Sequence, residues 1–283
     1  SESKYHQVDD YITHDAYTHH AAAAKLYLAP VRDAPAYLRE EMYASRFLQK
    51  LATVGTDGDA VKTAAFLPLR VLGQGYRMSE RAYNTYLNSL RYGVFKKYAQ
   101  HWQGIYSEDQ YHEELTRLAK WINRATGRGS LGTQGERAAE LLSTPFFSLR
   151  YLVSRPQALL HGLGTEGLTG AIAHLEKPSD LLDLVSMNPK TARAVAARNL
   201  VSWALGTVSL TALLKQSGLV EVSTEDPLSS DFGKITVGPT KLDLWAGYQP
   251  LIRFIMQFWA GAYTSASTGN TIEVARPLLI WKC

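Results

Sequence analysis

Four of the chain's eight histidines lie within its first twenty residues, where they could bind a metal ion. They are His6, His14, His19 and His20. Asp15 and His19 are four residues apart, a spacing that places two side chains on one face of a helix. The segment has no His-Glu-x-x-His pattern and no second carboxylate at a ligand spacing. We therefore expect exposed histidines on a helix that frays at its N-terminus, and no metal site.

Glycine is concentrated between Gly127 and Gly135, a segment that could form a phosphate-binding loop. A P-loop needs a lysine directly after its last glycine, and it follows a strand. This segment has no such lysine, and the residues before it have helical periodicity, so the dinucleotide-binding fingerprint fails as well. We interpret Gly127, Arg128 and Gly129 as a helix end followed by a tight connector.

Two pairs of charged side chains have spacings that could serve chemistry. Asp231 and Asp243 flank a predicted hairpin, where two carboxylates could act as an acid and a base. Turn capping by Asp231 is the simpler interpretation. Arg150 and Arg155 are five residues apart and could bind phosphate. Because arginine is frequent at interfaces, we expect these two to pair with acidic residues at a helix surface or an interface.

Nucleophile patterns are absent from the sequence. It contains no Gly-x-Ser-x-Gly motif, and its single cysteine, Cys283, is the last residue and has no evident base. One cysteine cannot form an intramolecular disulfide or supply a thiolate zinc site by itself. Catalytic groups that meet only in the folded chain leave no such motif. The sequence nevertheless favours a structural or interaction protein over an enzyme, with no catalytic, cofactor-binding or metal-binding residues.

The composition is that of a folded chain with a small positive charge. The 283 residues are 46% hydrophobic, which is enough to bury a core, and the net charge is +4. The basic residues are spread along the chain, whereas a dedicated nucleic-acid binder usually gathers them on one face or in one run. Tyrosine outnumbers phenylalanine by 16 to 8, and tyrosine suits interfaces because it combines apolar area with a hydroxyl group.

Most of the chain has the periodicity and the end signals of helices. Helices are expected from Asp9 or Asp10 to Leu28, Pro35 to Ala52, Ser79 to Gln103, Ser107 to about Gly127, Asn188 to Gly218 and Pro250 to about Ala262. Asn188, Ser79 and Ser107 are predicted N-caps, and Gly127 and Gly218 are predicted helix ends. Pro68 is expected to break the apolar segment 60–73.

The helix predicted from Asn188 to Gly218 is unusually apolar. It carries 16 uncharged residues between Arg198 and Lys215. A membrane-spanning helix needs about 20 apolar residues. We therefore expect a helix buried in the core, with a membrane span as the alternative.

The last third of the chain contains the only predicted strands. Residues 235–237 and 240–242 alternate as strands do, and Gly238-Pro239 between them predicts a two-residue hairpin turn. Two strands are only marginally stable alone, so this hairpin must pack on helices. The predicted fold class is mainly α, an irregular multi-helix assembly with one small β-hairpin near residues 235–242.

The sequence predicts three segments, at residues 1–76, 77–224 and 225–283, of which the last two could form one continuous domain. The chain does not begin with Met, and it ends on the apolar run "LLIWKC". We therefore expect a fragment or a processed piece of a longer polypeptide.

Five strings occur in an order that resembles a known family. They are "RMSERAYNTYLNSLR" (77–91), "WINRATGRGSLG" (121–132), "FFSLRYLVSR" (146–155), "EDPLSSDFGKITVGPTKLDLWAGYQP" (225–250) and "TSASTGN" (264–270). Together they resemble the large polyvalent protein-associated domains of tailed bacteriophages, over most of the chain. "SSDFGKI", followed by the hairpin and Asp-x-Trp-x-Gly, is the most specific part. Leu149 and Ala246 stand where the family pattern leads us to expect Pro and Gly.

The resemblance implies a virion-associated protein, and it implies neither a reaction nor a cofactor. We expect a non-enzymatic bacteriophage virion protein, an internal or ejected component involved in assembly and genome delivery. It would lie in the capsid lumen or the portal and tail region, and after delivery in the host cell envelope or cytoplasm. Its partners would be other virion proteins and copies of itself, with DNA and the host inner membrane as further contacts. The residues expected to have structural or interface roles are Gly127, Arg128, Gly129, Arg150, Arg155, Asp231, Phe232, Gly233, Lys234 and Trp245.

Two alternatives remain open. The first is a delivered nucleic-acid-binding or anti-restriction module, whose phosphate contacts would be Arg128, Arg150, Arg155 and Arg198. The second is a membrane-inserting segment of a DNA-ejection conduit, formed by residues 199–214. In that case Trp245, Trp259 and Trp281 would be anchors at the membrane interface, whereas otherwise they would fill a helical core.

Overall fold

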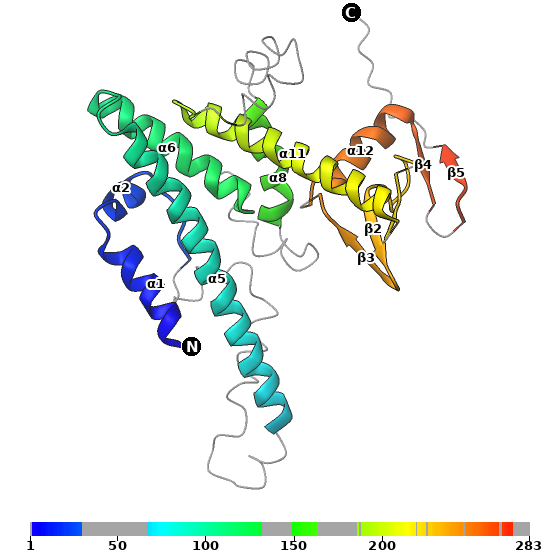
Figure 1. Ribbon diagram of the computed structural model, residues 1–283, viewed down its shortest axis with the longest axis horizontal. Coiled ribbons are helices and arrows are strands. Elements are labelled where there is room, and N and C mark those ends of the chain that lie inside the picture. The colour runs from blue at the N-terminus through cyan, green and yellow to red at the C-terminus, as the bar shows by residue number, and fades with distance from the viewer. Residues whose placement is uncertain are drawn as a thin grey trace, which may run out of the picture. The chain divides into compact units, whose positions relative to one another are not determined.

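The computed structural model is mostly helical, with a few short strands (Figure 1). It describes residues 2–29, 67–131, 149–163, 186, 188–218, 220–224, 226–245, 247–265 and 268–273. Within these residues the chain forms seven helices and five strands, which confirms the expected mainly α fold class. The helix predicted over 35–52 lies outside the described residues.

The chain divides into two compact units. Unit 1 comprises Ser1–Ile172 and Asn188–Ala196, and unit 2 comprises Ala173–Met187 and Ala197–Cys283. The boundary predicted between residues 76 and 77 falls inside unit 1, and the one between 224 and 225 falls inside unit 2.

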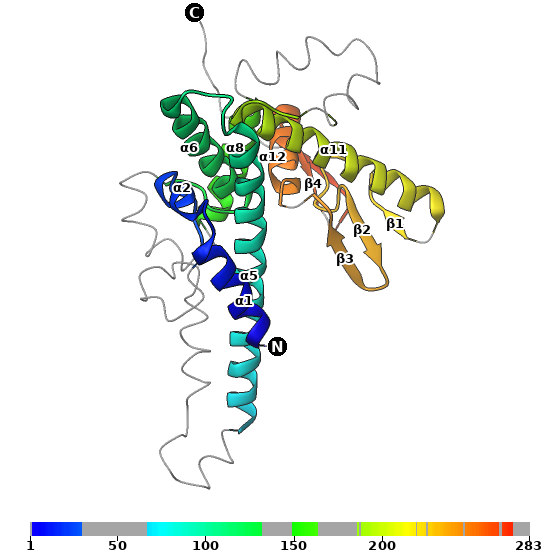
Figure 2. The same ribbon diagram turned by 60° about the vertical axis from the view of Figure 1, so that its left-hand side comes forward.

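Unit 1 is built around one long helix, α5 (Leu67–Trp102). Helices α1 (Glu2–His14) and α6 (Glu108–Ala125) lie against it, as both ribbon views show (Figures 1 and 2). The short α2 (Thr18–Ala23) and helix α8 (Leu149–Leu163) both contact α6. This arrangement places the C-terminal half of α5 in the middle of the unit.

The core of unit 1 lies along the buried side of α5. Phe95 and Trp102 are fully buried and are seven residues apart, which is two helical turns and therefore one face. They meet Leu115 and Leu118 of α6 in one hydrophobic cluster. Burial of each such side chain contributes about 1.5–3 kcal/mol to folding. The Trp102 indole also donates a hydrogen bond to the Pro189 carbonyl at 3.0 Å, so its one polar atom is satisfied.

Helix α5 begins at Leu67, twelve residues before the predicted cap at Ser79. The prediction was wrong because Pro68 starts this helix instead of breaking it. A proline is tolerated in the first turn of a helix, where its missing N–H needs no partner. Position 79 is therefore in the helix interior.

The first predicted helix, from residue 9 or 10 to residue 28, is in fact two helices separated by Asp15–Tyr17. The Asp15 carboxylate accepts the Tyr17 N–H at 3.0 Å, and the Asp15 carbonyl accepts the Thr18 N–H at 3.1 Å. In a continuous helix these N–H groups would bind carbonyls four residues earlier. Asp15 therefore competes with the helix and turns the chain.

The predicted ends of α6 are confirmed. The helix begins directly after Ser107, and Glu108 and Asp109 lie in its first turn, near the positive end of the helix dipole. It ends at Ala125, and Gly127 follows with φ +91°, a conformation that favours glycine.

Helix α11 (Ala192–Ser217) begins four residues after its predicted cap, Asn188. Thr191 caps the helix instead, because its hydroxyl accepts the Ala194 N–H at 3.2 Å. The Glu114 carboxylate of α6 accepts the Ala192 N–H at 2.7 Å. The predicted end at Gly218 is confirmed, with φ +66°.

The predicted hairpin is present in unit 2, as strands β2 (Lys234–Val237) and β3 (Thr240–Asp243). The two strands are antiparallel, with Val237 opposite Thr240. Gly238 has φ +57°, while Pro239 is held at negative φ by its ring, and this combination fits the predicted type II′ turn.

Three further short strands were not predicted. Strand β1 (Glu221–Val222) adds a third strand beside β2, and β4 (Ala262–Thr264) pairs with β5 (Thr271–Glu273). Segments of two or three residues are too short for alternation to be recognised. Helix α12 (Gln249–Ala260) lies between the two sheets in sequence, with Pro250 in its first turn as predicted.

Candidate interaction surface

The most specific string of the sequence folds so that its glycine and its tryptophan are in contact. The Trp245 indole N–H donates a hydrogen bond to the Gly233 carbonyl at 3.1 Å. A Cβ atom at position 233 would lie 2.2 Å from the Trp245 Nε1, and Gly233 has φ +74°. Both the space and the backbone therefore require glycine at this position.

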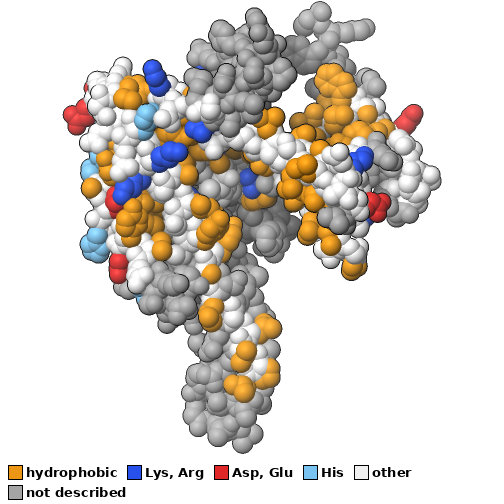
Figure 3. All heavy atoms as spheres, in the orientation of Figure 1, with side chains coloured by type: hydrophobic (Ala, Val, Ile, Leu, Met, Phe, Trp, Pro, Cys, Tyr) orange, Lys and Arg blue, Asp and Glu red, His pale blue; other side chains and the backbone are white. Residues whose placement is uncertain are grey.

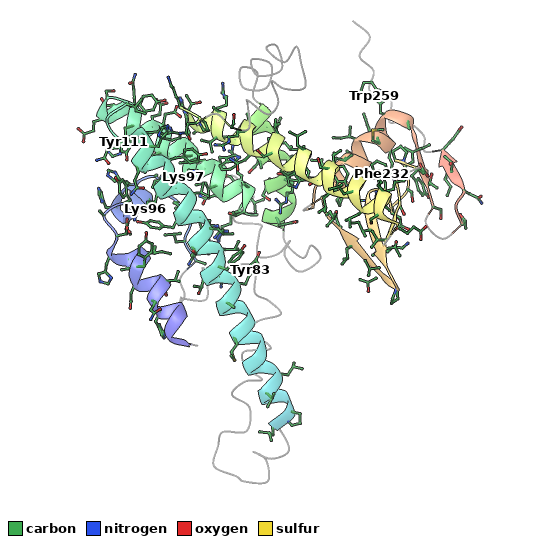
Figure 4. All side chains as sticks on the ribbon, viewed as in Figure 1. Tyr83, Lys96, Lys97, Tyr111, Phe232 and Trp259 are labelled. Atoms are coloured by element: carbon green, nitrogen blue, oxygen red, sulfur yellow. The ribbon has the colours of Figure 1, made fainter. Side chains whose placement is uncertain are left out.

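An aromatic cluster surrounds this contact. Phe232 is stacked on Trp245, with ring centroids 6.5 Å apart (Phe232 is labelled in Figure 4). Trp203 of α11 meets Trp245 edge to face at 6.2 Å, and its ring centroid lies 4.8 Å from that of Tyr248. Such aromatic pairs add to the stabilisation that burial gives. The cluster joins α11, the hairpin and the start of α12.

The Asp231 carboxylate binds two lysines, so the predicted turn capping by this side chain is wrong, and Asp231 does not pair with Asp243 as the alternative required. Its carboxylate lies 2.5 Å from the Lys241 Nζ and 3.4 Å from the Lys234 Nζ. The hydrogen bond from Lys241 holds the pKa of Asp231 below its usual value. The Asp243 carboxylate accepts the Trp245 N–H at 2.7 Å instead. The turn is closed by the main chain, since the Asp231 carbonyl accepts the Lys234 N–H at 3.0 Å.

The polar side of α12 attaches this helix to the turn before the hairpin. Gln249 is buried, and its amide donates to the Phe232 carbonyl at 3.2 Å. Gln257 donates to the Leu228 carbonyl at 2.8 Å. Gln249 thus satisfies the Phe232 carbonyl, whereas the Leu228 carbonyl accepts from both Gln257 and the Thr264 N–H, the latter at 3.3 Å. These bonds fix which side of α12 faces inward.

The other side of α12 is apolar and exposed, as the hydrophobic side chains over this helix in Figure 3 show. We call this surface the α12 face, and it consists of Phe254, Ile255, Met256, Phe258 and Trp259. Trp259 is 83% exposed and lies at the edge of the unit (Figure 4). A surface helix normally turns its apolar side inward. Helix α12 has the reverse orientation.

Helix α11 shows the same reversal in its C-terminal half. Val208, Leu210 and Leu213 are exposed, while Thr207 and Thr211 are buried. The Thr211 hydroxyl donates to the Thr207 carbonyl at 2.7 Å, so this buried hydroxyl is satisfied within the helix. The prediction of a helix buried in the core was therefore wrong for this part of α11.

Within the described residues, no helix combines the length and the apolar character that crossing a membrane requires.

The composition of the α12 face is that of a protein–protein interface. Aromatic side chains and methionine are enriched in interface cores, and exposed tryptophan often dominates binding energy. Helices that lie on a membrane surface usually carry several lysines or arginines on their polar side. Helix α12 has a single charged residue, Arg253, among its polar residues. The surface therefore fits an apolar surface of another protein better than a lipid surface.

The predicted connector after α6 is fixed by contacts with α8. A Cβ atom at Gly127 would lie 3.1 Å from the Tyr151 ring. Arg155 donates to the Ala125 carbonyl at 3.2 Å, at the C-terminal end of α6, and lies over the Tyr151 ring at 4.3 Å. Arg155 thus binds a helix end, where a positive charge is favourable.

Of the other predicted residues, Arg128 packs on a tyrosine: its guanidinium lies over the Tyr27 ring, 3.3 Å from the ring centroid. The next residue, Gly129, is buried. Arg150 is in the first turn of α8, and its side chain lies outside the described residues, as does Trp281. Arg128 and Arg155 thus each rest on a tyrosine ring.

The N-terminal histidines do not form a metal centre with Asp15. The Asp15 carboxylate is bound by Lys96 and accepts the Tyr92 hydroxyl at 2.6 Å. The His20 ring is tilted against the His19 ring, with the two centroids 3.9 Å apart, and burial lowers the pKa of His20. Among the residues that the structure describes, no group of three or more His, Cys, Asp or Glu side chains could hold a metal ion.

Sequence reasoning missed the glutamines that orient α12. Gln249 and Gln257 are eight residues apart, with Arg253 midway, so all three lie along one stripe of the helix. The sequence shows that these three polar residues lie on one side of the helix. It does not show that this side faces inward, because that depends on hydrogen bonds to the carbonyls of residues 228–232.

Comparisons with known proteins give no relative for this chain. No protein-family model matches it, and no curated protein or solved structure is significantly similar.

Proposed function

We propose that this protein is a non-enzymatic component of a tailed-bacteriophage virion, an internal or ejected protein that works by binding other virion proteins, copies of itself included. The order of its sequence strings supports the phage assignment. The α12 face carries the binding role, because it is a surface of large apolar side chains presented to solvent.

The partner of the α12 face is another protein of the particle. Exposed apolar patches of this kind on soluble proteins mark interaction sites. The hydrogen bonds of Gln249 and Gln257 hold the helix with its apolar side outward before any partner binds. Such preorganisation lowers the entropy cost of association. The partner should therefore supply an apolar pocket for Trp259 and Phe258.

Quantitative mass spectrometry of purified particles tests the virion assignment. The protein should be present in mature particles at a constant copy number. Its detection in infected cells but never in purified particles would show that it is not a virion protein.

A charge placed on the α12 face tests the binding role. In phage encoding Trp259→Asp, the number of copies per purified particle should fall at least tenfold, because an interface tryptophan often contributes 2 kcal/mol or more, which is about thirtyfold in affinity. The protein level in infected cells and the melting temperature of the purified chain should stay unchanged, because Trp259 is 83% exposed.

Thr268→Asp is the matched control for this experiment. Thr268 is exposed in the same unit, and its hydroxyl accepts the Asn270 N–H, a bond that an aspartate can also accept. The control should be incorporated as the unaltered protein is. Normal incorporation of Trp259→Asp would show that the α12 face is not the assembly surface.

A further inference from the structure

A second feature lies in unit 1, where α6 and α8 meet. The Arg124 Nη1 lies 3.1 Å from the His161 Nδ1. Because a guanidinium can only donate, the Nδ1 must be the unprotonated acceptor, and the imidazole is neutral. A cation therefore rests against a histidine where a carboxylate would be the usual partner.

Three more cations lie close enough to act on this histidine. They are Arg117 and Lys120 of α6 and Arg193 in the first turn of α11. Arg117, Lys120 and Arg124 are three and four residues apart, so they share one face of α6. Lys120 and Arg193 are exposed, and the side chain of Arg117 is 52% exposed. We call Arg117, Lys120, Arg124 and Arg193 the basic cluster.

Acidic side chains compensate only part of this charge. Glu113 and Glu114 both pair with Arg117, at 2.6 Å and 2.7 Å. Glu114 also accepts the Ala192 N–H, so its second oxygen is occupied. Within the described residues, Lys120 and Arg124 form no ion pair. The cluster therefore keeps an excess of positive charge.

The excess positive charge disfavours protonation of His161. Burial lowers the pKa of His161, and the charges of Arg124, Arg193, Lys120 and Arg117 lower it further, to about 4. Burial also lowers the pKa of Arg124. A bound anion would relieve the repulsion among these groups.

We propose that the basic cluster of unit 1 binds the phosphate backbone of a nucleic acid. This role goes beyond the assembly function proposed for the α12 face, and it rests on different residues.

The spacing of the cations favours an extended polyanion over a single phosphate. Arg117 and Arg124 are seven residues apart on α6, which is about 10 Å along the helix axis. One phosphate group is too small to contact both, whereas successive phosphates of a strand can. Arginine and lysine on a helix face are the usual donors to backbone phosphates.

Binding of the full-length chain to labelled duplex DNA, followed by fluorescence anisotropy at several salt concentrations, tests the proposal. The unaltered chain should bind, with log K falling linearly with log salt. In the double variant Lys120→Glu/Arg193→Glu the magnitude of this slope should fall by about 2, because each lost phosphate contact lowers it by about 0.9. The affinity at low salt should fall at least tenfold.

Lys97→Glu is the matched control. Lys97 is exposed on α5 of the same unit, and it is not among the charges that act on His161 (Figure 4). This variant should retain the slope. Equal losses in Lys97→Glu and in the double variant, or no DNA binding at low salt, would overturn the proposal. Saturable binding of inorganic phosphate without DNA binding would also overturn it, in favour of a small-anion site.

The pH dependence of DNA affinity provides a second test of the proposal. A bound phosphate backbone should raise the pKa of His161 above about 4, so DNA affinity should increase as the pH falls from 7 to 5. His161→Gln removes the titrating group and should weaken this increase. His101→Gln, at an exposed position on α5, is the control. An unchanged pH profile in His161→Gln would show that DNA does not bind at this cluster.

Discussion

The contact between Gly233 and Trp245 determines how the residues before the hairpin pack. The indole occupies the space of a Cβ atom and donates to the glycine carbonyl, so one side chain fixes both the position and the orientation of the turn. Phe232 and Trp203 then pack against the same indole. A single methyl group at position 233 would disturb all of these contacts.

Gly233→Ala should lower the free energy of unfolding by about 2–4 kcal/mol, from backbone strain at φ +74° and from overpacking against Trp245. Chemical denaturation followed by tryptophan fluorescence measures this loss. Gly206→Ala is the control, because Gly206 lies within α11 with open space around it. This control should be neutral or stabilise by up to about 1 kcal/mol. Equal stability of the two variants would contradict the packing argument.

At the scale of the elements, the junction between α1 and α2 is held to α5 by a polar network. Asp15 binds Lys96 and Tyr92 of α5 through its carboxylate. Burial alone would raise the pKa of Asp15, but the hydrogen bonds from Lys96, Tyr92 and the Tyr17 N–H outweigh it and lower the pKa to about 2. The same network raises the pKa of Tyr92 to about 12, through burial and the bond to Asp15.

Asp15→Asn should therefore destabilise the protein by about 1–2 kcal/mol at neutral pH, as expected for hydrogen bonds to a charged group. The folded-state pKa lies below the unfolded value of 3.8, so this stabilisation is present above pH 4 and is lost as the pH falls towards 2. Melting temperatures from pH 7 to pH 2 should converge for the variant and the unaltered protein. Asp10→Asn, at an exposed position, should show no such convergence. If the melting temperatures of Asp15→Asn and the unaltered protein differed by the same amount at every pH, the stabilising role of the ionised Asp15 carboxylate would be contradicted.

On the scale of the whole molecule, the two units present surfaces of different chemistry, one positively charged and one apolar. Unit 1 contains the basic cluster, and unit 2 contains the apolar α12 face. A polyanion binds the first through charge, which salt screens. A protein partner binds the second through apolar area, which salt affects much less. The two proposed roles should therefore be separable.

Testing each variant in the assay designed for the other surface shows whether the two roles are separable. Lys120→Glu/Arg193→Glu should leave the number of copies per particle unchanged within about twofold, and Trp259→Asp should leave DNA affinity and its salt slope unchanged. Residues in different units without shared partners usually act additively. Loss of both activities in either variant would show that the two surfaces serve one function.

The local features of this fold were predictable where they depend on a few neighbouring residues. The cap at Ser107, the glycine ends of α6 and α11 and the turn at Gly238 follow from backbone preferences that act over one turn. The start of α5 was misplaced because Pro68 has two permitted roles, and only the rest of the helix shows which one applies. The start of α11 was misplaced because Glu114 and Thr191, not Asn188, satisfy its first N–H groups.

The sequence by itself determined that this protein is mainly helical, that it has a hairpin at residues 235–242, and that its polar and apolar residues follow helical spacing. Only the tertiary structure decided which side of each helix faces inward. In α12 the polar stripe faces inward, where the amides of Gln257 and Gln249 donate to the carbonyls of residues 228 and 232. In α6, likewise, the spacing places three cations on one face, but only the packing of α8 and α11 brings His161 and Arg193 beside them. Periodicity shows that a helix has two sides, whereas partners distant in sequence decide which side is buried.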